Sequence, residues 1–276
     1  MRAHAPTSLE RPLDLLVPVA PLIRQRVALR QFLVRAITRR YRMSSLGFLW
    51  TMVIPLATLA IYTFVFGVVM PAPFGGGTTA FTLRLFSGLI VFWLMAEVVT
   101  QAPTSVVEQT NLVKKSVFPL EVIPAVVVGN ALFHGLVSTA VLMVAMLVLG
   151  AGIHPTAFLF PIVVLPLVLL LTGLAWLLAA IGVYFRDLTH IVGLLMTGAL
   201  FLSPVFYPLD RLSPGLRQAI MFNPISFIVG EARGVLLDGR MPDWNGLAVY
   251  LAVAWAVAAL GLCFFRRARK NFADVL

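Results

Sequence analysis

Six long apolar stretches, separated by short polar or basic segments, dominate this chain of 276 residues. They run approximately over residues 46–70, 85–107, 122–149, 157–185, 188–207 and 247–265. A helix of about 20 apolar residues crosses the ~30 Å hydrocarbon core of a bilayer, and each stretch is long enough to do so. Only Arg186 and Asp187 separate the fourth stretch from the fifth, so we expect a tight hairpin there. The pattern predicts an all-α integral membrane protein with six transmembrane helices.

The composition agrees with a membrane protein and excludes several other classes. Hydrophobic residues make up 60% of the chain and charged residues 12%, whereas a soluble domain has about 25% charged residues. The mean hydropathy is +0.97. Cys263 is the single cysteine, which excludes a disulfide framework and a cysteine-based metal site. The positive-inside rule explains the net charge of +10, so we expect no nucleic-acid partner.

The distribution of basic residues predicts the orientation of these helices. Of the 21 lysines and arginines, 16 fall before the first stretch, between the second and third, between the fourth and fifth, or after the sixth. The others are Arg84, Arg211, Arg217, Arg233 and Arg240. Since basic residues concentrate on the cytoplasmic side of a membrane, we expect both termini to be cytoplasmic.

The residues before the first stretch divide into an extended lead-in and a surface helix. Residues 1–21 contain four prolines and predict the lead-in. Over residues 22–44, polar and apolar side chains recur at helical spacing on opposite faces. The polar face comprises Arg24, Gln31, Arg35, Thr38 and Arg42. This pattern predicts an amphipathic helix along the membrane interface, ahead of a transmembrane domain at residues 45–276. An anchor with no further role is the alternative.

The polar segment 108–124, with the sequence EQTNLVKKSVFPLEVIP, lies between the second and third stretches. Its length suits a short helix across the membrane face, and an exposed Phe118 beside Lys114 and Lys115 suits docking onto another protein. A solvated loop is the alternative. A phosphate-binding GxxxxGK[ST] loop is absent, since no glycine in the chain precedes a lysine. If the protein works against a gradient, a separate chain must therefore handle ATP, or an ion gradient must drive it.

Three ionisable residues, Glu97, His134 and His190, lie within or close to the apolar stretches. Such residues are functional candidates by default in a membrane. We interpret His134 as a packed, hydrogen-bonded helix residue, His190 as an interfacial residue and Glu97 as facing a water-filled path. The three form no convincing constellation in the sequence. No catalytic triad, histidine-rich zinc spacing or carboxylate cluster is evident, so the sequence predicts neither catalytic residues nor a metal site.

Aromatic residues gather toward the outer ends of the first and fifth stretches and within the second. The candidates are Tyr62, Phe64, Phe66, Phe92, Trp93, Phe201, Phe206 and Tyr207. Aromatic faces can stack on the C–H faces of sugar rings while the hydroxyl groups stay hydrated, so such a lining would let a glycan slide. The alternative is an interfacial aromatic belt with ordinary helix packing.

The segment 210–244, between the fifth and sixth stretches, is amphipathic but too interrupted to form a full span. Two short helices, broken at Asn223 and Pro224, fit its pattern and would dip into the outer leaflet. Re-entrant backbone at that depth needs protein or water around it, which points to a cavity. The sequence therefore predicts a gate, with a simple lid on the bundle as the alternative.

Six segments, taken together and in order, carry a family resemblance. They are RRYRMSSLGFLWTMVIPL (39–56), FVFGVVM (64–70), NLVKKSVFPLEVIP (111–124), YFRDL (184–188), SPVFYPLDRL (203–212) and FNPISFIVGEARGVLLDG (222–239). They resemble the transmembrane permease subunits of type-2 ABC exporters for cell-surface polysaccharides, among them O-antigen, capsule and teichoic-acid exporters. The resemblance implies a homodimer of six-span subunits in the bacterial cytoplasmic (inner) membrane. The expected substrate is a polysaccharide linked to undecaprenyl pyrophosphate or a related lipid carrier.

The resemblance also implies where partners bind. Two copies of a separate ATPase subunit, holding ATP and Mg²⁺, would dock on the cytoplasmic face, while this chain would carry no cofactor. Contacts with the ATPase are expected at Arg35, Asn111, Lys114, Lys115, Phe118 and Pro119. The pyrophosphate of the lipid carrier, and the anionic headgroups of membrane lipids, are expected at Arg39, Arg40 and Arg42.

Channel and gate residues follow by position. The channel lining is expected at Tyr62, Phe66, Trp93, Glu97, Phe201, Phe206 and Tyr207. The external gate is expected at Asn223, Pro224, Glu231 and Arg233. Two alternatives stay open. One is an ABC exporter permease for drugs or small lipids. The other is an ion-coupled secondary transporter, for which Glu97 alone does not supply a coupling site.

Overall fold

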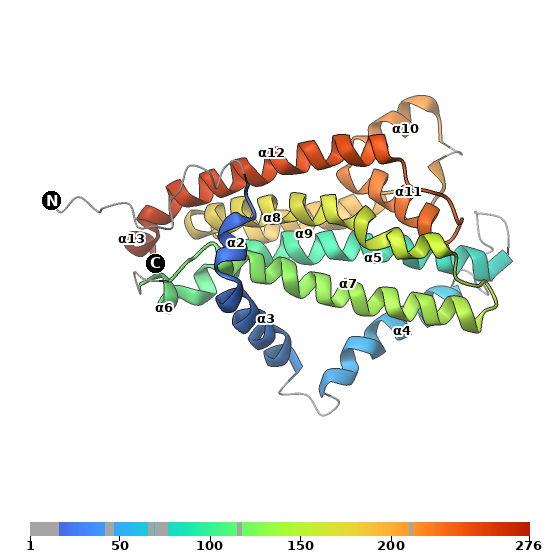
Figure 1. Cartoon of the computed structure of the whole chain (residues 1–276), viewed down its shortest axis with the longest axis horizontal. Coiled ribbons are helices and arrows are strands. Elements are labelled where there is room, and N and C mark those ends of the chain that lie inside the picture. The colour runs from blue at the N-terminus through green and yellow to red at the C-terminus, as the bar shows by residue number, and fades with distance from the viewer. Residues whose placement is uncertain (1–16, 42–46, 66–68, 70–76, 115–117, 210–211) are drawn as a thin grey trace.

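The computed structural model describes residues 17–41, 47–65, 69, 77–114, 118–209 and 212–276, and every regular element among them is a helix (Figure 1). The chain is an all-α integral membrane protein, as the apolar pattern predicts. Its longest helices run side by side as a bundle (Figure 1). They are α5 (Gly77–Ser105), α7 (Val122–Val148), α8 (Phe160–Tyr184) and α12 (Trp244–Ala268).

Within the described residues, five helical segments are long and apolar enough to cross a membrane. They are Gly47–Phe64, Thr79–Ser105, Val122–Val148, Pro155–Tyr184 and Trp244–Val275. The first contains α4 (Trp50–Phe64), and its predicted limits at residues 46 and 70 lie outside the described residues. The helices α10 (Pro214–Met221) and α11 (Pro224–Leu236) pass the same test only as a pair, bent by 96°. The predicted pair of short helices is therefore confirmed.

The helix α9 (Leu188–Phe201) is shorter than the stretch 188–207 that the sequence indicates. Its 14 residues give an axis of about 21 Å, less than the hydrocarbon thickness. The chain leaves the helix at Leu202 and turns through Ser203 and Pro204. Proline removes an N–H donor and disfavours helical backbone at the residue before it, which explains the early end.

The predicted surface helix is a pair, α2 (Ala20–Arg24) and α3 (Arg26–Tyr41), and α3 leaves the bundle at an angle (Figure 1). Its half-buried residues share one face and comprise Ala28, Leu29, Phe32, Leu33, Ala36 and Ile37. Leu33 packs on Gly129 of α7, where an added Cβ would lie 3.0 Å from Leu33 Cδ1. The described arginines of α3 outside this face, Arg26, Arg30, Arg35 and Arg39, are exposed. Part of the apolar face therefore serves to dock α3 onto the bundle.

The helices α8 and α12 approach each other closely because each carries glycine at the contact. A Cβ added at Gly261 would lie 2.2 Å from the carbonyl oxygen of Gly173. One added at Gly173 would lie 2.6 Å from the Cα atom of Ala258. In lipid, helices associate through close van der Waals packing rather than through the hydrophobic effect, so small residues at the contact stabilise the pair.

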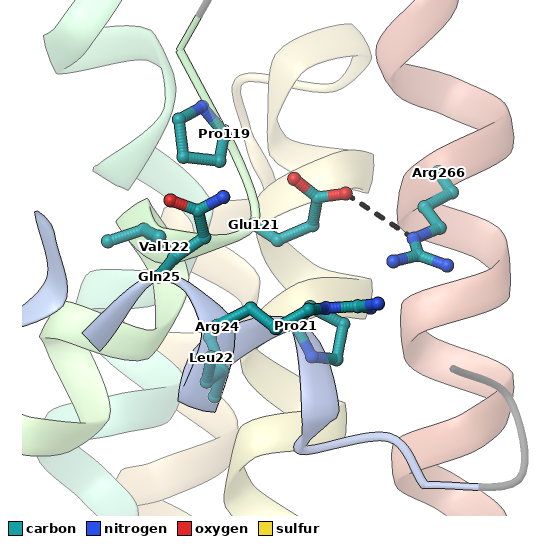
Figure 2. Close-up of a pocket in the computed structure, with 8 residues that line it drawn as sticks. All are labelled: Pro21, Leu22, Arg24, Gln25, Pro119, Glu121, Val122 and Arg266. Carbon is teal, nitrogen blue, oxygen red and sulfur yellow. Dashed lines mark hydrogen bonds and ion pairs between the residues drawn. The ribbon is translucent and has the colours of Figure 1, made fainter. Parts of the chain in front are cut away.

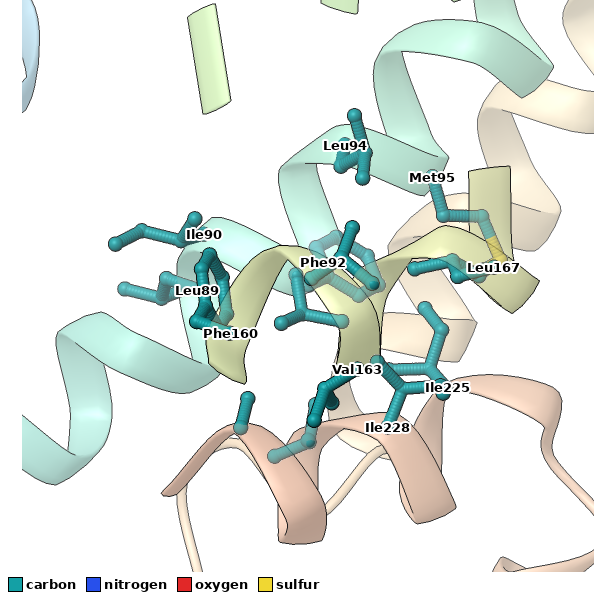
Figure 3. Packing of buried hydrophobic residues seen from close by; sticks show 14 of the residues in the cluster. Leu89, Ile90, Phe92, Leu94, Met95, Phe160, Val163, Leu167, Ile225 and Ile228 are labelled. Carbon is teal, nitrogen blue, oxygen red and sulfur yellow. The ribbon is translucent and has the colours of Figure 1, made fainter. Parts of the chain in front are cut away.

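The helix α5 lies at the centre of the bundle. In the most apolar 18 residues of α5, 78% are buried, whereas only 11% are buried in the corresponding stretch that contains α4. Its core partners come from α8 and α11. Figure 3 shows Leu89, Ile90 and Phe92 of α5 packed with Phe160, Val163 and Leu167 of α8 and with Ile225 and Ile228 of α11. Side chains of α5 therefore contact several neighbouring helices of the bundle.

The two ends of the bundle differ in charge. The helices α2, α6 (Thr110–Val113) and α13 (Phe272–Val275) lie together at one end, and α10 and α11 lie at the other (Figure 1). We call the first the basic end, because it carries Arg24, Lys114, Arg186, Arg266 and Arg269. The second is called the distal end. The C-terminal helix therefore lies at the same end as α2, the first described helix.

Candidate functional site

Two pairs of polar residues, each spaced one helical turn apart, face each other between α5 and α7. Glu97 and Gln101 lie on α5, and Asn130 and His134 lie on α7. Glu97 Oε1 accepts hydrogen bonds from Gln101 Nε2 at 3.2 Å and from Asn130 Nδ2 at 3.0 Å. His134 Nδ1 lies 2.9 Å from both carboxylate oxygens of Glu97. We call these four residues the polar cluster.

The sequence-based view that Glu97, His134 and His190 form no constellation is wrong for the first two. Glu97 and His134 are in direct contact, whereas His190 is exposed near the start of α9. The Glu97 side chain is only 16% exposed. A carboxylate with so little access to water depends on protein donors, and the polar cluster supplies three of them. His134 is hydrogen-bonded, as the sequence indicates, and its partner is an acid on the next helix.

A cavity of about 360 Å³ lies on one side of the polar cluster, between α4, α5 and α7. Trp50 and Trp93 line it together with Glu97 and His134. Trp93 and Glu97 are predicted channel residues. Trp50 was not predicted, because the aromatic pattern drew attention to the opposite end of the first stretch. We call this space the aromatic cavity.

A second cavity, of about 610 Å³, lies toward the basic end, between α3, the end of α5 and the start of α7. Its lining includes Arg35, Arg39 and Glu108, together with Gln101 and Asn130 of the polar cluster. We call it the basic cavity. Gln101 lines both cavities, so the polar cluster separates them.

The predicted pyrophosphate-binding arginines are only partly described. Arg39 is exposed and lines the basic cavity. The side chain of Arg40 and all of Arg42 lie outside the described residues. The basic cavity therefore places one of the three predicted arginines beside the polar cluster.

The other predicted channel residues form a separate aromatic group toward the distal end. The Phe206 ring lies 6.4 Å from the Tyr62 ring and 5.9 Å from the Phe201 ring, between centroids. The Tyr207 hydroxyl donates a hydrogen bond to the carbonyl oxygen of Phe201 at 3.0 Å. Phe66 lies outside the described residues. The predicted lining thus falls into two groups, one of them in the aromatic cavity.

At the basic end, the buried Glu121 joins the segment before α7 to the C-terminal part of the chain. Its Oε1 atom accepts hydrogen bonds from Arg269 Nη1 at 2.6 Å and from Arg266 Nε at 3.3 Å. Its carbonyl oxygen accepts one from Trp176 Nε1 at 3.0 Å. Figure 2 shows Glu121 beside Arg24 of α2, in a small cavity that both residues line. The sequence pattern did not single out Glu121, because its partners lie at the far C-terminal end of the chain.

The expectation of an exposed Phe118 is wrong. Its ring is half-buried and lies 4.9 Å from the Phe32 ring of α3, between centroids. The Arg35 guanidinium lies 5.7 Å from the centroid of the same Phe32 ring. Of the other predicted ATPase contacts, Asn111 and Lys114 are exposed, Pro119 is half-buried, and Lys115 lies outside the described residues.

At the distal end, the buried Arg233 of α11 ties three parts of the chain together. Its Nε atom donates to the carbonyl oxygen of Arg84 at 3.0 Å. Its Nη1 and Nη2 atoms donate to the carbonyl oxygens of Pro204 and Val205 at 2.7 and 2.8 Å. A Cβ added at Gly88 would lie 2.8 Å from Arg233 Nη2, so glycine leaves room for the guanidinium. Arg233 thus connects α11 to α5 and to the turn after α9.

The remaining predicted gate residues shape the same segment. Glu231 is buried and accepts hydrogen bonds from Arg240 Nη2 at 3.2 Å and from the Asp243 backbone N–H at 2.8 Å. Asn223 caps α11, since its Oδ1 atom accepts from the Ile225 backbone N–H at 3.1 Å. Pro224 follows at the first helical position, where a missing N–H costs nothing. Asn223 and Pro224 thus start α11 at its bend from α10, whereas the Glu231 contacts hold the connection from α11 to α12. A gating role stays a prediction.

The chemistry of the polar cluster and aromatic cavity is hydrogen bonding beside aromatic faces. Among the described residues, no group of three His, Cys, Asp or Glu side chains is placed to hold a metal ion. The indoles of Trp50 and Trp93 offer flat apolar faces, and the polar cluster offers carboxylate, amide and imidazole groups. A site that combines apolar faces with a few placed polar groups fixes the orientation of a small polar ligand.

Comparisons with a family profile and with individual known proteins point to the same class of transporter. The profile of the ABC-2 type transporter family matches residues 27–237. The O-antigen export system permease protein RfbA of Myxococcus xanthus is 31% identical over 264 residues, covering 93% of this chain and 98% of that protein. A protein of the same name from Klebsiella pneumoniae is 26% identical over 242 residues, covering 86% and 90%. The polysialic acid transport protein KpsM of Escherichia coli is 24% identical over 248 residues, covering 88% and 93%.

Proposed function

This chain belongs to the ABC-2 type transporter family, and from that premise we propose that it is the membrane-spanning subunit of an ATP-driven polysaccharide exporter. Its cargo would be a lipid-linked cell-surface polysaccharide. The observation that carries the proposal is the similarity, over nearly the whole chain, to permeases named for O-antigen export. The similarity to a polysialic acid transport protein supports the same class of cargo.

The geometry of the cavities supports a sugar as cargo. A sugar ring has apolar C–H faces and polar edges, and it needs both kinds of contact to leave water. The aromatic cavity offers Trp50 and Trp93 for the faces and the polar cluster for the hydroxyl groups. The aromatic group around Phe206 offers further faces toward the distal end. A drug or a small lipid would have less use for the polar cluster.

The proposed complex is a homodimer of this chain with two copies of a separate ATPase subunit that binds ATP and Mg²⁺. In this arrangement the basic end and both termini face the cytoplasm of a bacterium, across its inner membrane. The ATPase contacts the chain at five of the six residues that the resemblance indicates, Asn111, Lys114, Lys115, Phe118 and Pro119. The sixth, Arg35, lines the basic cavity. The packing of Phe118 on Phe32 connects this surface directly to α3.

The substrate is proposed to arrive from the cytoplasmic leaflet. Arg39, Arg40 and Arg42 bind the pyrophosphate of an undecaprenyl-type carrier and the anionic headgroups around it. The distal end, with Asn223, Pro224, Glu231 and Arg233, opens to release the glycan. Glu97, by contrast, acts as a hydrogen-bonding group on the path and not as a site that couples transport to ions.

Reconstitution of this chain with a candidate ATPase subunit tests the proposal. The two proteins are expected to purify together, and lipid-linked glycan is expected to change the rate of ATP hydrolysis. Stimulation by drugs or short lipids, with no effect of the glycan, would replace the proposal with a small-molecule exporter. If no ATPase associates and an ion gradient drives uptake into vesicles, the protein is a secondary transporter instead.

A further inference from the structure

The basic cavity combines two features. The exposed side chains of Arg35 and Arg39 lie at its edge, and its lining includes Asn130, whose buried amide oxygen has no hydrogen-bond partner among the described residues. We propose that this cavity is a glycosyl-pyrophosphate subsite, where Arg35 and Arg39 bind the pyrophosphate and Asn130 accepts a hydrogen bond from the first sugar. This inference rests on the proposed function, since it assigns the sugar end of the lipid carrier to one cavity of this chain.

The arginines supply the charge that a pyrophosphate requires. Arg35 and Arg39 lie one helical turn apart on α3, both are exposed, and both line the basic cavity. Neither has an ion-pair partner within the described part of the chain. Glu108 lines the same cavity, so two guanidinium groups stand against one carboxylate. Guanidinium groups bind phosphate oxygens in a bidentate manner, and two of them at this spacing suit two linked phosphates.

Asn130 supplies the evidence for a hydroxyl group. The residue is 7% exposed, and its Nδ2 atom donates to Glu97 Oε1 at 3.0 Å. That contact orients the amide, because the opposite orientation would place two acceptor oxygens together. Its Oδ1 atom then has no hydrogen-bond partner among the described residues. A buried acceptor without a partner is costly, so a donor from a ligand is favoured there.

The two features select the chemical class of the ligand. A phosphate group alone accepts hydrogen bonds at neutral pH and does not satisfy Asn130 Oδ1. A sugar alone gives the arginines no anion. A sugar joined to a pyrophosphate supplies both groups, and the volume of about 610 Å³ lies within the usual range of ligand sites, about 300–1,000 Å³.

Other groups in the basic cavity fit the same ligand. The Thr104 hydroxyl donates to the Gln101 carbonyl oxygen at 3.3 Å, and the Ser105 hydroxyl donates to that of Ala102 at 2.7 Å. Both residues line the cavity, and each hydroxyl oxygen keeps lone pairs that can accept from sugar hydroxyl groups. Because Gln101 lines the aromatic cavity as well, a second sugar would continue past the polar cluster toward Trp93.

Two matched probes separate the two halves of the subsite. Farnesyl pyrophosphate carries the anion alone, and farnesyl pyrophosphoryl-N-acetylglucosamine carries the anion and one sugar. Affinity is measured for both on the complete transporter, this chain with its ATPase, in lipid nanodiscs. In the unsubstituted protein the sugar is expected to raise the affinity about threefold to tenfold, the effect of one or two neutral hydrogen bonds.

The arginine variants and the Asn130 variants are expected to affect the two probes differently. Arg35→Gln and Arg39→Gln should each lower the affinity for both probes about tenfold or more. The gain in affinity from the sugar should remain. Arg30→Gln is the control, since Arg30 is exposed on the same helix but does not line the cavity. Asn130→Leu and the smaller change Asn130→Ser should abolish the effect of the sugar and spare farnesyl pyrophosphate. His134→Gln disturbs Glu97 from outside the basic cavity and should keep the effect of the sugar.

Three results would overturn the subsite. They are an effect of the sugar that survives both Asn130 changes, an Arg39→Gln variant that matches Arg30→Gln, and no binding of either probe. In the first case a water molecule, and not a sugar, satisfies Asn130. ATP-driven transport of long glycan, measured on the unsubstituted complex, reports separately on the exporter proposal. If the complex transports glycan but the probes do not bind as predicted, only the subsite proposal fails. If the probes bind as predicted but no glycan is transported, only the exporter proposal fails.

Discussion

Glu97 of α5 and His134 of α7 are 37 positions apart in the chain, yet His134 Nδ1 lies 2.9 Å from both oxygens of the Glu97 carboxylate. Gln101 and Asn130 donate to the same carboxylate. One side chain of α5 is therefore the shared acceptor for donors on both helices. The polar cluster both joins α5 to α7 and separates the two cavities.

Removal of this acceptor should cost more than removal of a single hydrogen bond. Glu97→Leu leaves Gln101, Asn130 and His134 without their acceptor, and we expect a loss of about 2 kcal/mol or more in the free energy of unfolding. Glu97→Gln keeps an acceptor oxygen and should lose less. Denaturant unfolding in micelles measures the difference.

Thr100→Val is the matched control for Glu97→Leu. Thr100 lies on the same helix, and its hydroxyl donates to the carbonyl oxygens of Ala96 and Glu97 within that helix. Its loss should cost less than about 1 kcal/mol. Equal stabilities of the Glu97→Leu and Thr100→Val variants would contradict the shared-acceptor role.

Glu121 should hold the C-terminal segment against the basic end. Glu121→Gln removes the charge that Arg266 and Arg269 share, and the residue is 4% exposed. Breaking a buried ion pair costs about 3 kcal/mol or more, so backbone amides from residue 266 onward should exchange faster with solvent. Hydrogen–deuterium exchange measures this.

Glu108→Gln serves as the control for the Glu121 change, because Glu108 is exposed at the same end and has no ion-pair partner among the described residues. Its exchange pattern should match that of the unsubstituted protein. The anchor role of Glu121 fails if both variants exchange alike.

Arg233 and Gly88 should give the same defect at the distal end. Arg233→Lys cannot reach the three carbonyl oxygens that the guanidinium binds. Gly88→Ala places a Cβ 2.8 Å from Arg233 Nη2 and displaces the same group. Both should lower the melting temperature and expose residues 203–205 to proteolysis. Gly230→Ala on α11 is the control, since its Cβ meets nothing within 4 Å, and protection equal to that control in either variant would count against the contact.

The close approach of α8 and α12 should tolerate no added methyl group. Gly261→Ala would bring a Cβ to 2.2 Å from the backbone of Gly173, so the helices must move apart along their shared contact. We expect a loss of about 2 kcal/mol or more, in the range of overpacked cores. Gly193→Ala on α9, which meets nothing within 4 Å, should cost nothing measurable. Similar unfolding midpoints for the two variants would show that this contact is not tight.

The all-α membrane fold could be predicted from the sequence because apolar length is a local property of each stretch. The break at Asn223 and Pro224 is local as well, since a capping side chain followed by proline starts a helix wherever it occurs. The end of α9 before Pro204 was also readable in principle, and the apolar pattern running to Tyr207 obscured it. Features that depend on one or two neighbouring residues were therefore accessible.

The polar cluster could not be predicted, because it depends on how α5 and α7 are aligned along their length. A shift of one residue on either helix would turn Glu97 away from His134. One signal was nevertheless present, since Glu97 with Gln101 and Asn130 with His134 are polar pairs one turn apart in apolar helices. Such pairs mark faces that point toward protein. The contact of Glu121 with Arg269 joins residues 148 positions apart and had no comparable signal.

ATP-driven movement of glycan by the purified complex tests the central claim most directly. Proteoliposomes with the ATPase facing outward receive lipid-linked polysaccharide in the outer leaflet, and an added glycosidase then digests whatever remains outside. We predict that ATP protects the glycan from digestion only when this chain is present, and that an ATPase subunit unable to hydrolyse ATP gives no protection. Glycan that stays fully digestible while ATP is hydrolysed, or that becomes protected by an ion gradient without ATP, would contradict the account.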